Sequence, residues 1–187
     1  MSRVIYNHDN VTKAVVGTVG VPGERQFFLQ VSSSNGLTCV AIEKSQAIAL
    51  VERLRLLIRE LRRSQLASFD ELNLSVNEEV LSLEYPITED FRVGVMSISW
   101  NQESERIAIE AQALGDETIT ELLSDDEALL IEDAPDLLTF NLRIHQARSF
   151  CDRTELVIAA GRQPCPFCGS PVDPAGHLCP RANGYRR

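Results

Sequence analysis

The sequence predicts an α+β fold in which an antiparallel sheet is covered on one face by two helices and followed by a separate C-terminal tail. Three observations support this prediction. Alternating apolar and polar residues recur in both halves of the chain, two segments carry apolar residues at helical spacing, and three of the five cysteines fall in the last 23 residues. For a chain of 187 residues we therefore expect one core domain over residues 1–161 and a tail over residues 162–187.

Composition and charge exclude several classes to which this protein could belong. The hydrophobic fraction is 44% and the formal net charge is −9, which indicates a chain that buries a core and argues against a general binder of nucleic acid or anionic membrane. The sequence has no apolar run near the roughly 20 residues that span a bilayer, and its start has no signal-peptide pattern. We therefore expect a cytoplasmic protein without membrane association.

The first half predicts an antiparallel meander followed by a helix. Strands are expected over residues 13–20, 25–32 and 37–43, where alternation is interrupted by the turn sequences VPGE and SSSNG. The stretch GTVGVPG is similar to a phosphate-binding glycine loop, but a strand and not a helix follows it, so we interpret it as a hairpin turn. A helix is expected over residues 45–63, with Ser45 as its N-cap.

The second half repeats this order. A hairpin is expected over residues 92–113, a strand over 136–142 and a helix over 145–160 that Gly161 ends. The segment 115–136 carries nine acidic residues and no basic one, which equals the whole net charge; we expect a peripheral loop with a short helix there. Aligning residues 38–63 with 138–163 gives six identities, which predicts a two-fold internal repeat or reflects chance between two amphipathic helices.

The tail carries the residues with the clearest chemistry. Cys165 and Cys168 have the two-residue spacing that directs two sulfurs at one ion, and His177 and Cys179 follow within 11 residues of Cys168. An odd number of cysteines without a secretion signal favours metal or reduced thiols over disulfides. The set predicts a closed structural zinc site, with Asp173 or water as the alternative to His177. A redox role for the CPFC sequence is the competing interpretation, but Gly169 and two prolines follow it where a helix would be needed to lower a thiol pKa.

Two groups of residues outside the metal set are candidates for binding. Arg106, Glu110 and Gln112 fall on the polar face of the expected hairpin, where they would line a pocket or simply face solvent. The basic end of the tail, with Arg181, Asn183, Tyr185 and Arg186, would bind phosphate, RNA or an acidic protein, or is a frayed terminus. We find no catalytic constellation, because His8 and His145 have no nucleophile or carboxylate at a diagnostic spacing.

Four stretches carry a resemblance to a known family. The sequences GTVGVPGERQFFLQ, EDFRVGVMSISW, RIAIEAQA and the tail from AAGRQPCPFCG to HLCPRANGYRR are similar to an actinobacterial family called domain of unknown function 3090. The resemblance covers nearly the whole chain and is most distinctive at its two ends. It implies metal ligands at Cys165, Cys168, His177 and Cys179, and it implies no activity.

These observations favour a non-enzymatic cytoplasmic protein that binds zinc structurally and recognises a protein partner through its basic tail. An enzyme acting on a phosphorylated small molecule is the first alternative, and it requires a concave pocket at the polar hairpin face. RNA binding through the tail is the second, and it requires affinity that falls steeply with salt.

Overall fold

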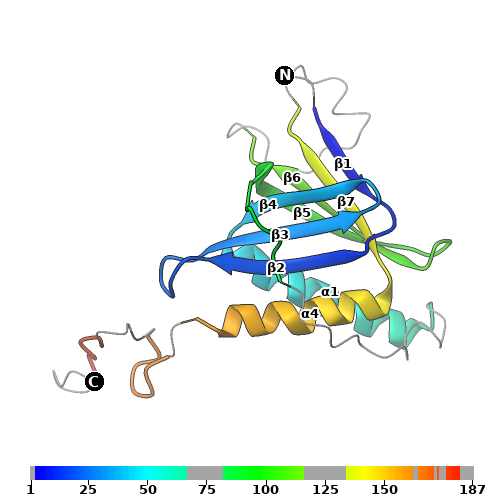
Figure 1. The fold of residues 1–187 in the computed structure, drawn as a ribbon. Helices are drawn as coiled ribbons and strands as arrows, with labels where there is room; N and C mark the ends of the chain where they lie inside the picture. The colour runs from blue at the N-terminus through cyan, green and yellow to red at the C-terminus, as the bar shows by residue number, and fades with distance from the viewer. Residues whose placement is uncertain are drawn as a thin grey trace.

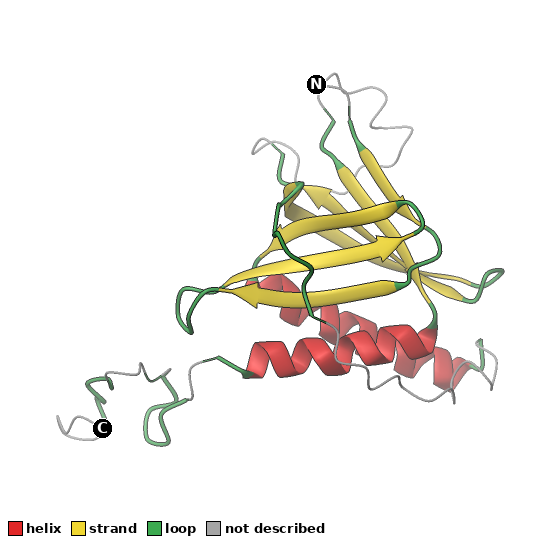
Figure 2. Cartoon of the chain, in the orientation of Figure 1, coloured by secondary structure: helices red, strands yellow, loops and turns green. Residues whose placement is uncertain are grey.

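The fold is a strongly curved sheet packed over two helices. The computed structural model describes residues 3–66, 82–115, 134–161, 164–170, 172 and 176–181. Figures 1 and 2 show the sheet curving above α1 and α4, with the C-terminal tail continuing beyond α4. The α+β class and the two covering helices are therefore confirmed.

Seven strands form one sheet in the order β1-β7-β6-β5-β4-β3-β2. Their bounds are Ile5–His8 for β1, Lys13–Val19 for β2, Gln26–Ser33 for β3, Gly36–Ile42 for β4, Phe91–Asn101 for β5, Arg106–Ala113 for β6 and Leu137–Leu142 for β7.

The sheet is mixed, whereas the sequence predicted an antiparallel one. Strand β1 runs parallel to β7, and β4 runs parallel to β5. The second pairing arises because α1 carries the chain back between β4 and β5, and a helical crossover of this kind returns the next strand in the same direction. The hairpins themselves are antiparallel as predicted.

Both helices begin one residue after an N-cap that the sequence did not single out. Helix α1 spans Lys44–Ser64 and is capped by Glu43, so the prediction of Ser45 as N-cap was wrong. The side chain of Gln46 decides this start, because its Oε1 accepts a hydrogen bond of 2.8 Å from the backbone N–H of Glu43. Helix α4 spans Ile144–Ala159, and Gly161 lies just beyond it as expected.

The main core lies between the helices and the concave face of the sheet. Leu54 of α1, Phe150 of α4 and Phe140 of β7 are all at most 1% exposed within it. A smaller cluster covers the other face of β2, β3 and β4, where Leu83 packs with Phe28. Removing these apolar side chains from water supplies most of the stability of such a fold.

The two halves of the sheet have the same order and the same register. Strand β6 begins and ends 80 residues after β3, and β7 ends 100 residues after β4. Leu29 pairs with Val40 in the first half, and Ile109 pairs with Phe140, at the corresponding positions, in the second. Each half is thus three antiparallel strands followed by a helix, which is the arrangement that a sequence repeat would produce. A common origin of the halves stays a prediction.

Each helix lies against the first strand of the other half. Helix α4 contacts β2, and α1 contacts both β5 and α4. Equivalent hydrogen bonds accompany this exchange: the amide nitrogen of Gln46 donates to the carbonyl of Val93 and that of Gln146 to the carbonyl of Val11, both at 3.1 Å. The halves are therefore interlocked through their helices.

The greater part of the acidic segment, residues 116–133, lies outside the described residues, and so does the short helix expected there. Among the described helices, neither is long and apolar enough to cross a bilayer.

Candidate metal centre

The first half of the tail folds as a tight turn that directs two sulfurs to the same side. The backbone N–H of Gly169 donates to the carbonyl of Cys165 at 2.8 Å, and the N–H of Cys165 donates to the carbonyl of Ser170 at 2.8 Å. Gly169 has a φ of 76°, a conformation that residues with a Cβ adopt rarely. The two-residue spacing of Cys165 and Cys168 therefore directs both sulfurs at one point, as the sequence predicted. We call the segment from Cys165 to Cys179 the knuckle.

The second half of the tail brings an imidazole and a third sulfur to this turn. The Sγ atoms of Cys165 and Cys179 lie 3.8 Å apart, and the Sγ of Cys168 lies 3.2 Å from Nε2 of His177. All four ligand atoms lie within 4.8 Å of one another. No disulfide joins the five cysteines, all of which the structure describes.

The geometry of these atoms fits a tetrahedral zinc ion. Two sulfurs that each lie about 2.3 Å from one ion are separated by roughly 3.8 Å along the edge of a tetrahedron, which matches the distance between Cys165 and Cys179. Three thiolates and one imidazole leave no position for a substrate, so a metal held here would be structural. Cys165, Cys168, His177 and Cys179 thus form a cluster that can hold a metal ion. Asp173, the alternative to His177, lies outside the described residues.

The surroundings of Cys168 favour its thiolate. Hydrogen bonds from the side chain and backbone of Ser170, followed by one from His177, lower the pKa of Cys168 to about 6. Because the thiolate is the form that ligates metal, this arrangement favours metal binding at neutral pH.

The predicted binding residues of the hairpin share one face of β6. Arg106, Glu110 and Gln112 alternate with Ile107, Ile109 and Ala111, whose side chains belong to the core under the helices. Ser97 Oγ donates to a carboxylate oxygen of Glu110 at 3.0 Å, and Gln112 is 1% exposed. The three residues therefore lie on the sheet face that points away from the helices.

The basic end of the tail is described only at its start. Arg181 donates from its guanidinium to the carbonyl of Phe167 at 3.3 Å, which ties it to the knuckle. Asn183, Tyr185 and Arg186 lie outside the described residues.

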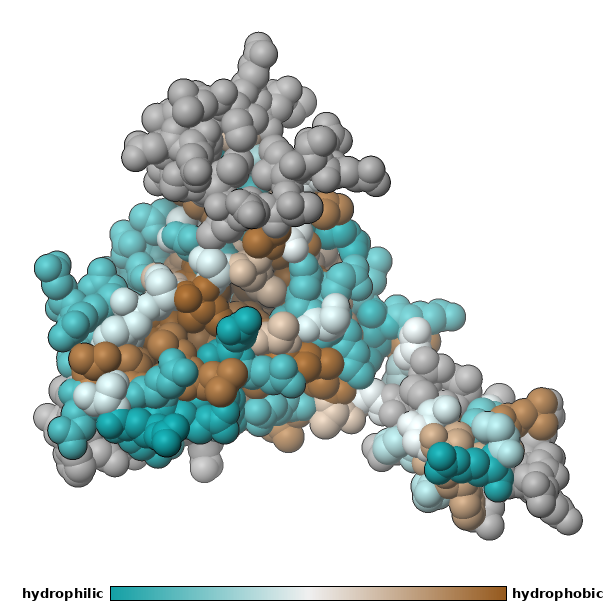
Figure 3. Space-filling view, turned by 180° about the vertical axis from the view of Figure 1, so that it is seen from behind, coloured by the Kyte–Doolittle hydropathy of each residue, from teal (hydrophilic) through white to brown (hydrophobic). Residues whose placement is uncertain are grey.

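Two hollows in the core domain were missed by sequence reasoning. An apolar hollow of about 450 Å³ lies between α1 and β5, lined by Leu50, Met96 and Ile98 among others. Figure 3, which views the molecule from behind relative to Figure 1, shows apolar surface across the middle of the sheet-and-helix part. A basic hollow of about 350 Å³ lies where the β2–β3 turn meets the start of α1. The sequence signal for the second was the glycine-rich turn, whose neighbouring helix comes from elsewhere in the chain.

A comparison with protein-family models matches almost all of the described fold, from Tyr6 in β1 to the last metal ligand, Cys179. Residues 6–179 match the model of DUF3090, described as a protein of unknown function. The chain belongs to the DUF3090 family. No curated protein and no solved structure matches it. The resemblance drawn from the sequence is thereby confirmed, while a restriction of DUF3090 to actinobacteria stays an expectation.

Proposed function

We propose that this DUF3090 protein is a non-enzymatic recognition protein of the cytoplasm, whose C-terminal knuckle is held together by zinc and binds a protein partner. The proposal rests above all on one observation, the convergence of the four ligand atoms of Cys165, Cys168, His177 and Cys179 within 4.8 Å. A reducing cytoplasm also suits five cysteines that form no disulfide.

The knuckle has the side chains of a contact surface. Phe167 is 41% exposed and Leu178 is 70% exposed, and Arg181 is anchored beside them through the carbonyl of Phe167. Exposed aromatic and apolar side chains next to an arginine are typical of protein interfaces. A metal that fixes both halves of the knuckle would hold these three side chains in place, so that little conformational entropy is lost on binding.

Such a surface fits a partner with an apolar patch bordered by carboxylates. The remainder of the tail adds Asn183, Tyr185 and Arg186 to the same end of the chain. Guanidinium groups bind carboxylates through paired hydrogen bonds, which favours an acidic protein surface over a purely apolar one.

Metal analysis of protein purified without added zinc tests the first part. We expect about one equivalent of zinc in the wild type and in Phe167→Ser, and less than half an equivalent in Cys168→Ser. Substoichiometric zinc in the wild type, with freely titratable thiols, would overturn the metal assignment.

Capture from a native lysate tests the second part. We expect proteins retained by the full chain to be lost with a chain lacking the last 26 residues and with Phe167→Ser, which keeps its metal. Nuclease treatment of the lysate should leave the capture unchanged, because the proposed contact is made directly with a protein. A contact bridged by RNA would disappear under this treatment. Identical retention by the full and the shortened chain contradicts recognition through the tail.

A further inference from the structure

The basic hollow, which is separate from the knuckle, has the construction of a small anion site. Four elements that are far apart in the sequence meet there: the turn before β3, the end of β4 with the start of α1, the beginning of β5 and the end of α4. Three cationic side chains, those of Arg25, Lys44 and Arg92, line it together with the ring of Phe27. Its volume of about 350 Å³ falls at the small end of the range for ligand pockets.

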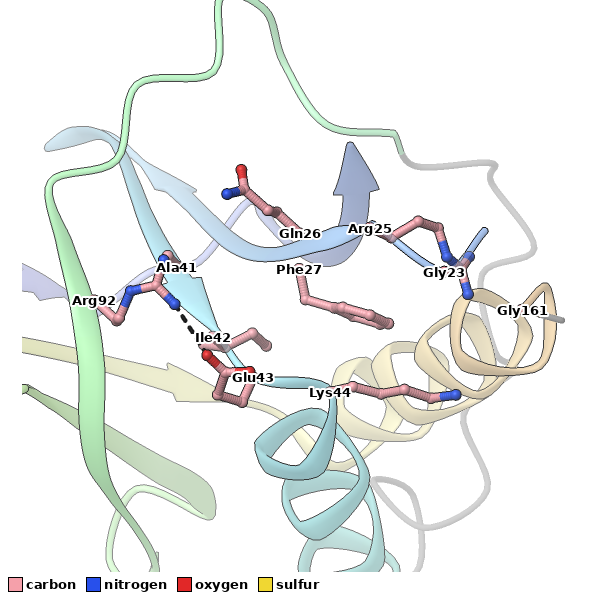
Figure 4. Close-up of a pocket in the computed structure, with 10 residues that line it drawn as sticks. All are labelled: Gly23, Arg25, Gln26, Phe27, Ala41, Ile42, Glu43, Lys44, Arg92 and Gly161. Atoms are coloured by element: carbon pink, nitrogen blue, oxygen red, sulfur yellow. Dashed lines mark hydrogen bonds and ion pairs between the residues drawn. The ribbon is translucent and has the colours of Figure 1, made fainter. Parts of the chain in front are cut away.

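Two of the cations converge at one end of the hollow. A Cβ atom placed on Gly161 would lie 3.0 Å from a terminal nitrogen of Arg25 and 3.8 Å from Nζ of Lys44, so both charges approach the same point. Figure 4 shows both side chains extending toward Gly161, with Arg25 above and Lys44 below. Within the described part of the chain, no carboxylate pairs with either of them.

The protein itself neutralises only part of this charge. Arg25 donates to the carbonyl of Val157 at 3.3 Å, in the last turn of α4. The C-terminal end of a helix carries roughly half a negative charge, which is much less than the two full positive charges directed at it. At the start of α1 the backbone N–H of Glu43 is not available as a donor to an anion, because it already donates to Oε1 of Gln46 at 2.8 Å. An oxyanion at this point would therefore be stabilised chiefly by Arg25 and Lys44.

The other end of the hollow is polar and neutral. Arg92 donates to a carboxylate oxygen of Glu43 at 3.0 Å, so the two charges compensate each other. The ring of Phe27 lies between this ion pair and the two converging cations (Figure 4). A ligand that fills the hollow would place a dianion against Arg25 and Lys44 and polar groups against the ion pair.

We propose that this hollow binds a small phosphate monoester, with its phosphate held by Arg25 and Lys44. A phosphate dianion matches the two uncompensated charges, whereas a single carboxylate would leave one unmatched. The ion pair of Arg92 and Glu43 would contact hydroxyl or amino groups of the esterified part.

Titration of the full, zinc-loaded chain with inorganic phosphate, followed by calorimetry or by backbone amide shifts, tests the site. We expect saturable binding in the wild type and at least tenfold weaker binding in Lys44→Gln, since a hydrogen bond to a charged group is lost. Arg62→Gln is the matched control, because it removes the same charge from the far end of α1 and should change the affinity by less than about twofold.

Two substitutions at Gly161 sharpen the test. Gly161→Asp would place a carboxylate between Arg25 and Lys44 as a built-in competitor, and we expect it to abolish phosphate binding while the melting temperature is maintained. Gly161→Ala adds only the Cβ and should bind phosphate as the wild type does, because the flexible ends of Arg25 and Lys44 can move aside.

Three results would overturn the proposal: no saturable binding of inorganic phosphate by the wild type, equal losses in Lys44→Gln and Arg62→Gln, or acetate binding as tightly as phosphate. A failure of zinc binding or of partner capture by the tail would leave these measurements unaffected, because the hollow lies within the core domain.

Discussion

Gly17 lies directly beneath Leu83 on the outer face of the sheet. A Cβ atom at position 17 would lie 2.4–2.9 Å from three carbons of the Leu83 side chain, which is closer than packed atoms approach. The segment that carries Leu83 is held at a fixed distance from the sheet by two hydrogen bonds. The side-chain amide of Gln30 donates to the carbonyl of Glu84 at 3.0 Å and accepts from the backbone N–H of Glu84 at 2.7 Å. The absence of a side chain at Gly17 is thus what allows Leu83 to cover β2 and β3.

We predict that Gly17→Ala lowers the free energy of unfolding by about 1–3 kcal/mol, the usual cost of overpacking. Leu83→Ala alone should cost about 2–4 kcal/mol through loss of buried surface. The double variant should cost clearly less than the sum, since the smaller side chain makes room for the new Cβ. Urea unfolding of the three variants and the wild type measures the difference, and strictly additive costs would contradict the contact.

His8 introduces a pH dependence into the core. Its ring nitrogens lie 2.7 Å from Ser33 Oγ and 2.8 Å from Thr38 Oγ1, and burial lowers the pKa of His8 below its usual value near 6.5. The unfolded chain therefore binds a proton more readily than the folded chain. Stability is fully present above pH 6.5 and falls as the pH drops from there toward the pKa of the folded state.

We predict that the wild type loses more stability between pH 7.5 and pH 5.5 than His8→Gln does. Glutamine keeps a polar contact to the hydroxyls but does not titrate, so the difference between the two curves isolates the histidine. Urea unfolding at both pH values measures it. Parallel pH curves for the two proteins would show that His8 is protonated equally in the folded and unfolded states.

At the scale of elements, Gln46 and Gln146 can be tested for the hydrogen bonds that each makes to the other half of the chain. In Gln46→Glu the carboxylate can still accept from the N–H of Glu43, but the donor to the carbonyl of Val93 is replaced by an acceptor. We expect a loss of about 1–3 kcal/mol in unfolding free energy, the cost of leaving a carbonyl unpaired beside a charge. Gln146→Glu should show the same loss at the carbonyl of Val11. Unchanged stability in both variants would rule out the cross-half bonds as stabilising contacts.

Local patterns explain which elements could be predicted. The six strands of the two hairpin units and both helices were placed within about two residues, because alternation and helical spacing are properties of neighbouring residues. The start of α1 was misplaced because Gln46, at the third position of the helix, determines the cap and not Ser45. The parallel pairing of β4 with β5 had no local signature, since residues 40 and 91 meet only through the path of α1.

The metal site could be predicted from the sequence and the basic hollow could not, for the same reason. The metal ligands were predicted because all four fall within 15 consecutive residues, from Cys165 to Cys179. The basic hollow was not, because Arg25, Lys44 and Arg92 come from three separate elements. The glycine-rich turn was correctly interpreted as a hairpin, yet the fold brings it beside the start of α1 in space.

At the scale of the whole molecule, we expect zinc removal to unfold the tail while the core stays folded. Cys39 is 3% exposed and Cys151 is 0% exposed, and burial raises the pKa of Cys151 to about 12. With a strong chelator present, we predict that a thiol reagent modifies the three knuckle cysteines quickly while the two core cysteines stay protected until the protein unfolds. Rapid reaction of all five thiols would mean that the core depends on the metal.

A chain that ends at Gly161 tests the expected domain boundary. The sheet, both helices and their buried side chains all fall before this residue, so we predict a melting temperature within a few degrees of the full chain. Differential scanning calorimetry measures it. A cooperative unfolding transition that disappears on truncation would place the tail within the folding unit.

The exchange of helices between the halves has a consequence for assembly. A fragment that stops at Leu66 would contain α1 but not β5, the strand that α1 contacts. It would also contain β2 without α4, the helix that packs against it. Such a fragment would have a bare apolar surface of the right shape to accept the complementary piece of the chain. Expressed together as two polypeptides split between Leu66 and Ser82, the pieces should therefore reconstitute a non-covalent pair, and a lone piece should associate with copies of itself.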